Sequence, residues 1–248
     1  MAVLVRLTGG MVTRVSVCLA TYNGERFLRE QLNSILSQLL CDDEVIVSDD
    51  NSDDNTRSIV MSYNDRRVRL ITNPSRRGHV GNFANAMVHA TGQFIALSDQ
   101  DDIWVEHRLE RMLNLMKEQP ELSLVIGDFV EFNRTGQLHA LPDLGPSPKN
   151  GLTQLSRIFL GRAKYWGCTF LFRRELTRFI LPIPRRIESH DIWIAMNACI
   201  HGRVGHLQEV TLLRRLHDQN VSQPRRGLPI ILRSRINYFL GLIQASIR

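Results

Sequence analysis

The chain has 248 residues, of which 43% are hydrophobic and 23% are charged, and its formal net charge is +6. This balance supplies a sizeable core and excludes an intrinsically disordered chain, and no apolar run approaches the roughly 18–20 residues of a membrane-spanning helix. Residues 203–248 hold eight arginines against two acids, but they lack aromatic interleaving and any known binding motif, so nucleic acid is not favoured as a partner.

Strand-like and helix-like patterns alternate through the first half of the chain. Apolar residues at helical spacing predict helices over 25–39, 54–63, 81–89 and 105–118. Short runs of β-branched and apolar residues predict strands over 15–20, 44–48, 68–72, 94–97 and 122–126. Strands that alternate with helices imply an α/β fold, with a mostly parallel sheet flanked by helices on both faces.

Beyond residue 133 the pattern loosens. Residues 134–150 are rich in Pro and Gly and are expected to form a surface loop. The remaining patterns predict a helix over 152–160, a strand over 167–172, a helix over 190–201, a strand over 207–213 and a helix over 228–247. We find no internal repeat and no linker, so residues 1–248 are predicted to form one domain.

The ends of the chain and its cysteines indicate a cellular compartment. Residues 1–14 lack a long apolar region followed by a cleavage site, so we expect an extension before the first strand, and Met11 could be the natural start. Four cysteines lie far apart, without the paired spacing of a zinc site. Cys18 and Cys168 lie within apolar runs and are interpreted as reduced core residues. Together these features favour the cytoplasm.

Polar motifs follow three of the predicted strands. They are Thr-Tyr-Asn-Gly at 21–24, Asp-Asp-Asn-Ser at 49–52 and Ser-Asp-Gln-Asp-Asp at 98–102. Ligands of parallel α/β sheets bind outside the carboxyl ends of the strands. We therefore expect these motifs to meet at one rim of the sheet.

Asp99 and Asp101 follow the fourth predicted strand and carry the strongest chemical signal. Residues two apart in an extended segment point the same way, and no Lys or Arg stands beside them in the sequence. Like charges this close raise one another's pKa, and a hard divalent cation with a bound phosphate would relieve the repulsion. The alternative is an acidic turn that faces water.

Asp49 and Asp50 end the second predicted strand. A carboxylate there can accept hydrogen bonds from a base N–H or a ribose hydroxyl. The alternative is that this segment only forms an Asx turn or a helix cap through Asp53 or Asp54. The spacing also resembles an Asp-Asp-x-x-Asp prenyl-diphosphate motif, which we reject because that motif requires a helix and a β-type run precedes this one.

Two further motifs lie near the same rim. Gly24 lets the backbone approach a ligand and the Tyr22 ring can lie against a base. Arg77, before the third predicted helix, could neutralise a phosphate. His190-Asp191 opens a predicted helix, so Asp191 is either a helix cap or a general base for an acceptor hydroxyl.

In combination, three ordered segments resemble family 2 glycosyltransferases of the GT-A fold. They are VSVCLATYNG at 15–24, DDNSD at 49–53 and SDQDDIW at 98–104. The nearest likeness is to bacterial rhamnosyltransferase-like members that act on polysaccharides, and it extends over about residues 14–222. It implies a Rossmann-like GT-A sheet, a nucleotide-sugar-binding half at 14–133 and an acceptor half at 134–222.

The resemblance also implies roles for residues. Thr21, Tyr22 and Asn23 would line the nucleotide pocket, and Asp49 or Asp50 would contact the base. Asp99, Gln100 and Asp101 would form the Asp-x-Asp element that touches ribose, with Asp99 and Asp101 holding Mg²⁺ or Mn²⁺ on the diphosphate.

The implied reaction is an inverting transfer of a sugar, with rhamnose as the first candidate, to a glycan or lipid-linked acceptor. Asp191 would be the base; His190 replaces the family's common Glu, as in the rhamnosyltransferase-like branch, and its role stays open. Residues 215–220 fall where related enzymes place a flexible loop over the donor phosphates.

The predicted C-terminal helix is apolar and basic. Ile230, Ile236, Phe239 and Ile243 alternate with arginines such as Arg233. Such a helix can lie on an anionic membrane surface, here the inner face of the plasma membrane. Core packing and a dimer contact remain equally open alternatives.

Two other functions use similar residues. A nucleotidyltransferase also combines strand-end carboxylates with a metal, but it would normally show a Gly-rich basic loop after the first strand, which residues 21–26 lack. A non-catalytic nucleotide-sugar-binding module is disfavoured because Asp99, Asp101 and Asp191 are all present.

Overall fold

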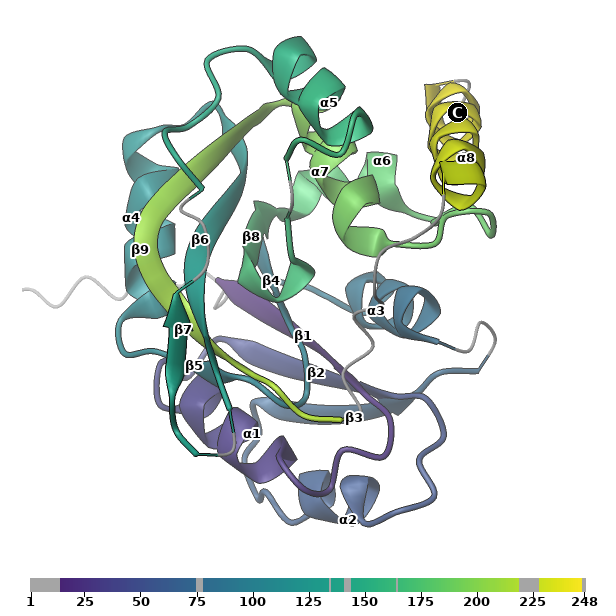
Figure 1. Cartoon of the computed structure of the whole chain (residues 1–248). Coiled ribbons are helices and arrows are strands. Elements are labelled where there is room, and N and C mark those ends of the chain that lie inside the picture. Colours follow the sequence, from purple (N-terminus) through teal and green to yellow (C-terminus); the bar gives the residue numbers. More distant parts are fainter. Residues whose placement is uncertain are drawn as a thin grey trace, which may run out of the picture.

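The computed structural model describes residues 14–74, 78–133, 135–140, 144–163, 165–218 and 228–246. Within these ranges nine strands form one sheet in the order β3-β2-β1-β4-β8-β6-β9-β5, with β7 paired to β6 (Figure 1). The strands are β1 (Val15–Thr21), β2 (Glu44–Asp49), β3 (Val68–Thr72), β4 (Phe94–Ser98), β5 (Ile103–Trp104), β6 (Leu122–Phe132), β7 (Leu138–Ala140), β8 (Phe170–Arg173) and β9 (Arg203–Arg215).

The sheet changes direction in its middle. Strands β3, β2, β1 and β4 run parallel to one another. Strand β8 is antiparallel to both β4 and β6, whereas β9 runs parallel to β6 and antiparallel to β5. The predicted parallel α/β sheet is therefore confirmed in the first half and gives way to a mixed arrangement in the second.

Helices cover both faces of the sheet, as the alternating pattern predicts. They are α1 (Leu28–Leu36), α2 (Thr56–Met61), α3 (His79–Val88), α4 (Arg108–Glu118), α5 (Gly151–Phe159), α6 (Thr177–Ile180), α7 (His190–His201) and α8 (Leu228–Ser246). Short 3₁₀ turns, η1 (Gly167–Thr169) and η2 (Arg174–Leu176), flank β8.

The core divides into two layers because successive residues of a strand point to opposite faces. In β1, Val17 and Leu19 pack into one buried cluster with residues of α1 and α4. Cys18, between them, packs into the other cluster with residues of α3 and α7. Burial on both faces explains why the parallel strands read as continuous apolar runs rather than as alternating ones.

The structure corrects several predicted boundaries. The predicted loop over 134–150 contains β7, the predicted strand over 167–172 opens with the turn η1, and the predicted strand over 207–213 is the central part of the longer β9. Helix α1 begins at Leu28 rather than at 25, because Glu25 reaches the Asn55 backbone and holds a turn before the helix. Strand β5 and helix α6 were not predicted, because each is too short for its apolar residues to show a periodic pattern.

Strand β9 (yellow-green in Figure 1) connects distant parts of the molecule. This long, curved strand begins near α5 and ends near α1, and its last part pairs with β5. Its last residue, Arg215, bonds Glu30 of α1 at 2.5 Å. The C-terminal end of β9 therefore lies beside the segment that follows β4.

Two predictions about the chain's chemistry can also be compared with the structure. The four cysteines are free thiols, and Cys18 and Cys168 are buried as expected. Among the described residues, none of the helices has the length and apolar character needed to cross a bilayer.

Candidate active site

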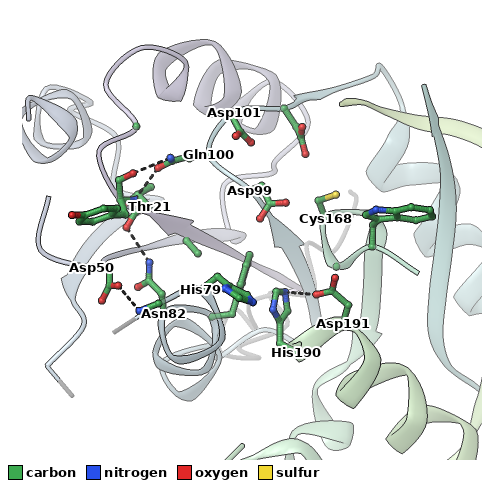
Figure 2. A pocket seen from close by; sticks show the side chains of 18 of the residues that line it. Thr21, Asp50, His79, Asn82, Asp99, Gln100, Asp101, Cys168, His190 and Asp191 are labelled. Carbon is green, nitrogen blue, oxygen red and sulfur yellow. Dashed lines mark hydrogen bonds and ion pairs between the residues drawn. The ribbon is translucent and has the colours of Figure 1, made fainter. Parts of the chain in front are cut away.

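The three polar strand ends meet at the carboxyl edge of the parallel half of the sheet, as predicted. Asp50 N donates to Thr21 O at 2.9 Å, and the Gln100 side chain contacts the Tyr22 backbone. Together with the start of α7 and the end of β9 they line a pocket of about 740 Å³ (Figure 2).

One side of this pocket carries the residues predicted for the nucleotide. Tyr22 is half exposed, whereas Thr21 is buried beneath it. Asp50 faces the pocket, and its two oxygens accept from Asn73 Nδ2 at 2.8 Å and Gly78 N at 2.6 Å. Each carboxylate oxygen still has a second lone pair for a ligand.

Asp49 has a different position from the one expected. Its side chain is fully buried and outside the pocket lining. Its oxygens accept from the Ser52 backbone and hydroxyl at 3.0 and 2.6 Å and lie 3.3 Å from the Thr21 hydroxyl. Of the two carboxylates named from the sequence, the structure places Asp50 in the pocket and uses Asp49 to hold the turn.

Gln100 binds the loop after β1 with both ends of its amide. Its Oε1 accepts from Tyr22 N at 2.8 Å, and its Nε2 donates to Tyr22 O at 3.0 Å. A Cβ on Gly24 would lie 2.3 Å from Gln100 Oε1, so the close approach requires glycine. Asn23, with φ of 48°, completes this tight loop, and its Oδ1 accepts from Asp53 N.

Asn82 of α3 also lines the pocket, although the sequence analysis did not name it. Its Nδ2 donates to Thr21 O at 3.0 Å, while its Oδ1 is buried without a hydrogen-bond partner. An unpartnered acceptor in such a position suits a ligand N–H or O–H. Helix α3 contains two asparagines, Asn82 and Asn85, and no sequence signal distinguishes the one that faces the pocket.

The acidic corner after β4 differs in part from the expected pairing of Asp99 with Asp101: Asp99 is grouped with Asp102, whereas Asp101 Oδ2 lies 2.7 Å from His217 Nε2. Burial, and then the charge of Asp101, raise the pKa of Asp99 to about 7. Asp102 is buried, and one of its carboxylate oxygens has no hydrogen-bond partner. Oxygens of Asp99 and Asp102 and the Cys168 sulfur lie within 4.8 Å of one another.

Basic residues near these carboxylates come from β9, far away in the sequence. Arg215 N donates to Asp102 Oδ1 at 3.2 Å, and its Nε donates to the Asp101 carbonyl at 3.1 Å. His217 Nε2 lies 2.7 Å from Asp101 Oδ2. The absence of a neighbouring base in the sequence therefore did not predict the folded surroundings of this corner.

The acidic corner fits a divalent cation, on the evidence of its own chemistry. Two of its three grouped ligand atoms are hard carboxylate oxygens, of Asp99 and Asp102, which Mg²⁺ and Mn²⁺ prefer, and the third is the Cys168 sulfur. One buried oxygen of Asp102 lacks a partner, and burial together with the charge of Asp101 raises the pKa of Asp99. Added positive charge would lower that pKa and satisfy the oxygen.

Asp191 lies in the first turn of α7 and faces the same pocket. The N-cap role is taken by Ser189, whose hydroxyl accepts from Ile192 N at 3.3 Å, so the Asp191 carboxylate is not used as a cap. In Figure 2, Asp99 lies between Asp101 on one side and the His190–Asp191 pair on the other.

His190 is buried against the Phe83 ring, with 4.2 Å between the ring centroids. Its Nε2 lies 2.7 Å from Asp191 Oδ1, at angles outside those of a good hydrogen bond. Burial raises the pKa of Asp191, but His190, the Gly167 N–H and His79 outweigh it, so the pKa lies below its ordinary value. The site therefore holds Asp191 as a carboxylate.

Turn η1 approaches this carboxylate closely. A Cβ on Gly167 would lie 2.7 Å from His190 Nε2 and 2.8 Å from Asp191 Oδ1. The next residue is fixed by the fully buried Arg108, whose Nη2 donates to Cys168 O at 2.6 Å. Burial lowers the pKa of Arg108 to about 10, although the nearby charge of Asp102 acts to raise it. Arg108 thus positions η1 from behind.

Three of the residues singled out from the sequence lie outside the described parts of the chain. Arg77 lies outside the described residues, as do Gln219 and Asn220 of the expected loop over the donor phosphates. Conversely, Arg214 lines the pocket, although no motif in the sequence indicated it. It forms a close ion pair with Glu131 of β6.

The family model Glycosyl transferase family 2 matches residues 16–181, which hold most of these strand-end motifs. The chain belongs to this family. The match confirms the resemblance read from the three segments at the level of the family, while the rhamnosyltransferase-like branch is not distinguished by it.

Curated family 2 relatives are similar over part of their length. Escherichia coli WfgD, a UDP-Glc:alpha-D-GlcNAc-diphosphoundecaprenol beta-1,3-glucosyltransferase, is 35% identical over 119 residues, 48% of this chain and 47% of WfgD. The putative glycosyltransferase EpsE of Bacillus subtilis is 30% identical over 189 residues, 73% of this chain and 66% of EpsE. The chain thus spans about half of the one relative and about two thirds of the other.

Solved structures support the family 2 fold. Staphylococcus aureus TarS 1–349, in complex with UDP-GlcNAc, superposes with a TM-score of 0.74 at 19% identity, over 94% of this chain and 70% of that one. The mannosyltransferase PcManGT of Pyrobaculum calidifontis, in complex with GDP-Man and Mn²⁺, gives 0.62 at 19% identity, over 94% and 73%. The chain therefore has the GT-A-like α/β fold that the motifs implied.

We expect Asp99→Asn to stabilise the metal-free protein increasingly as the pH rises from about 4 to about 7. In that range folded Asp99, with a pKa of about 7, holds its proton more than the unfolded chain, whose ordinary value is 3.8. Wild-type stability therefore falls with rising pH, by at most about 1.4 kcal/mol per pH unit for one group. Asparagine does not ionise and removes this loss.

The measurement is denaturant unfolding at a series of pH values in the presence of a chelator. Asp53→Asn, which removes an exposed carboxylate elsewhere, is the matched control. Parallel stability curves for wild type and Asp99→Asn would contradict the raised pKa.

Proposed function

We propose that the protein is an inverting glycosyltransferase, which moves a sugar from a nucleotide-sugar donor to an acceptor hydroxyl in bacterial cell-surface polysaccharide synthesis. One observation carries the proposal: a carboxylate held in its charged form, Asp191, lines the same pocket as the acidic corner of Asp99 and Asp101. Family membership supports the reaction class.

The donor's nucleoside would occupy the side of the pocket formed by the loop after β1. Asp50 and Asn82 offer hydrogen-bond acceptors to a base or ribose, and the exposed Tyr22 ring offers a flat surface. Gln100 fixes the loop that carries Tyr22. These residues bind and orient the donor.

The diphosphate would lie against the acidic corner. Asp99 and Asp101 would hold Mg²⁺ or Mn²⁺ there, with Asp102 and His217 beside them. When bound, such an ion acts as a Lewis acid on the departing phosphate oxygens. Arg214, which lines the same part of the pocket, adds positive charge from the protein itself.

Asp191 would accept the proton of the acceptor hydroxyl as the new glycosidic bond forms. A positioned base of this kind contributes about 10²–10⁴-fold. His190 and the Gly167 N–H keep the carboxylate ionised and hold it in place. Attack from the side opposite the leaving diphosphate inverts the anomeric carbon.

A covalent route through a protein nucleophile is disfavoured by the surroundings of Cys168. This thiol lines the pocket, but burial and the charges of Asp102 and Asp99 raise its pKa well above its ordinary value. A thiol rather than a thiolate is a poor nucleophile. A single displacement, with Asp191 as the base, fits the site better.

The activities for which relatives are named guide the choice of donor and acceptor. WfgD is named for UDP-glucose and a diphosphoundecaprenol-linked acceptor. We therefore propose a UDP-hexose as the first donor to test, with dTDP-rhamnose, favoured by the sequence likeness, as the second. We propose a lipid-linked glycan as the acceptor, used on the cytoplasmic side of the membrane, which agrees with the four free cysteines.

Replacing Asp191 with Asn tests the proposed base. The substitution keeps the shape of the side chain and removes its basicity, so donor binding should persist while transfer falls by at least about 10²-fold. Calorimetry gives donor affinity, and single-turnover transfer gives the rate. A variant with near-normal transfer would refute the assignment.

Gly167→Ala tests the same carboxylate without changing its chemistry. The added methyl group would lie under 3 Å from the His190 ring and the Asp191 carboxylate, which must move. We expect transfer to fall by about 10²-fold, because small misplacements of reacting groups have effects of that size. The melting temperature serves as the folding control, and an unchanged rate would show that the contact is not needed.

Asp101→Ala tests the acidic corner. We expect Mn²⁺-dependent donor binding to weaken by at least about tenfold, because the variant removes a charge-bearing ligand atom. Calorimetry with UDP-glucose and dTDP-rhamnose, each with and without Mn²⁺, provides the measurement. Glu118→Ala removes an exposed acid from α4 as the matched control, and equal affinities in wild type and Asp101→Ala would argue against metal binding there.

A further inference from the structure

Helix α8 packs against the segment that carries the proposed base. Its inner face consists of Ser234, Tyr238 and Gly241, which are spaced four and three residues apart and are buried. Tyr238 OH lies 3.4 Å from Ser189 O, directly before α7. A Cβ on Gly241 would lie 3.0 Å from the Trp193 ring, so the helix axis comes close to α7.

The opposite face of α8 is apolar and uncovered by the described chain. Helical spacing of four and three residues places its members on one stripe. Each is between 42% and 63% exposed. We call this set the outer stripe, and its residues are Leu232, Ile236, Phe239, Leu240 and Ile243. Figure 1 shows α8 (yellow) at the edge of the molecule beside α6, on the side away from β9.

The charged side chains of α8 itself have one sign, and Arg235 among them lies over the Phe159 ring of α5. Helix α8 contains Arg233 and Arg235 and no Asp or Glu over Leu228–Ser246. Arg186, from the loop before α7, donates from Nη2 to Gln244 Oε1 at 3.2 Å and so lies beside the helix. A carboxylate that does contact α8, Glu188, bonds Ser234 on the inner face.

We propose that the outer stripe of α8 docks on an anionic lipid bilayer. A helix that buries apolar side chains at the headgroup boundary, with arginines at its margins, fits such a surface. A second copy of the chain fits less well, because two α8 helices would bring arginines together without carboxylates of their own to pair with them. A bilayer with acidic headgroups satisfies both the apolar stripe and the arginines.

Docking in this way would place the bilayer next to the proposed acceptor side of the pocket. Glu188 and Ser189, which contact the inner face of α8, also line the pocket beside Asp191. A lipid-linked acceptor would then reach Asp191 from the membrane surface over this short segment. This last step rests on the proposed function, whereas bilayer docking itself does not.

Vesicle co-sedimentation of the full chain tests the docking. We expect binding to vesicles of phosphatidylcholine mixed with phosphatidylglycerol, and weak binding to phosphatidylcholine alone. The triple variant Leu232→Ser, Ile236→Ser, Phe239→Ser should bind these vesicles at least about tenfold more weakly than wild type, because three apolar side chains no longer enter the lipid. Circular dichroism and donor binding in solution confirm that this variant is folded.

A matched variant removes three apolar side chains of similar exposure from other surfaces. Met61→Ser, Val88→Ser, Leu138→Ser changes α2, α3 and β7, where the original side chains are 61–66% exposed, and should bind vesicles as wild type does. Failure of wild type to bind anionic vesicles, or equal binding by the outer-stripe variant, would overturn the proposal. So would a wild-type dimer in ultracentrifugation that the outer-stripe variant abolishes, since it would assign the stripe to a second copy.

The same samples separate this proposal from the proposed function. Vesicle binding needs neither donor nor transfer, so docking without any transfer would support the interface and count against the enzyme activity. Transfer to a short soluble acceptor without vesicle binding would support the enzyme activity and count against the membrane interface.

Discussion

The site depends on the burial of several carboxylates at the end of one strand. Asp99, Asp101 and Asp102 lie together in a partly dehydrated corner, and burial, followed by the charge of Asp101, raises the pKa of Asp99. The charges of His190 and Arg214 lower that pKa in part, and the end of β9 brings the Arg215 N–H groups and His217 to the same corner. The remaining negative charge is what makes the corner suited to a cation that arrives with a phosphate.

Support from behind the pocket is as important as the residues that line it. Arg108, fully buried, holds the carbonyl of Cys168 and so fixes the turn that touches Asp191. Helix α8 contacts the same region from the other side through Tyr238. The proposed base is therefore positioned by packing on both sides, which lowers the reorganisation needed during reaction.

Much of the donor side could be predicted, because parallel strands place their polar ends at one edge and the strand-end motifs are short and local. Sequence could not tell which of Asp49 and Asp50 faces the pocket, since a turn decides it through Ser52. It also could not find Asn82 or the approach of β9 to the acidic corner. Those contacts join residues that are 61 and 113 positions apart, so no local sequence pattern indicates them.

The reversal of strand direction between β4 and β8 has an evolutionary consequence. The loops of the parallel portion supply Tyr22, Asp50 and the acidic corner, whereas the proposed base and its supports come from α7, η1 and α8 beyond the reversal, and the end of β9 returns to the acidic corner. If the proposed function holds, substitutions in α7, η1 and α8 would alter the surroundings of Asp191 while the loops after β1 and β2 stay unchanged. Under the proposed function, duplicated copies of the gene could then diverge in acceptor while they keep the same nucleotide-binding loops.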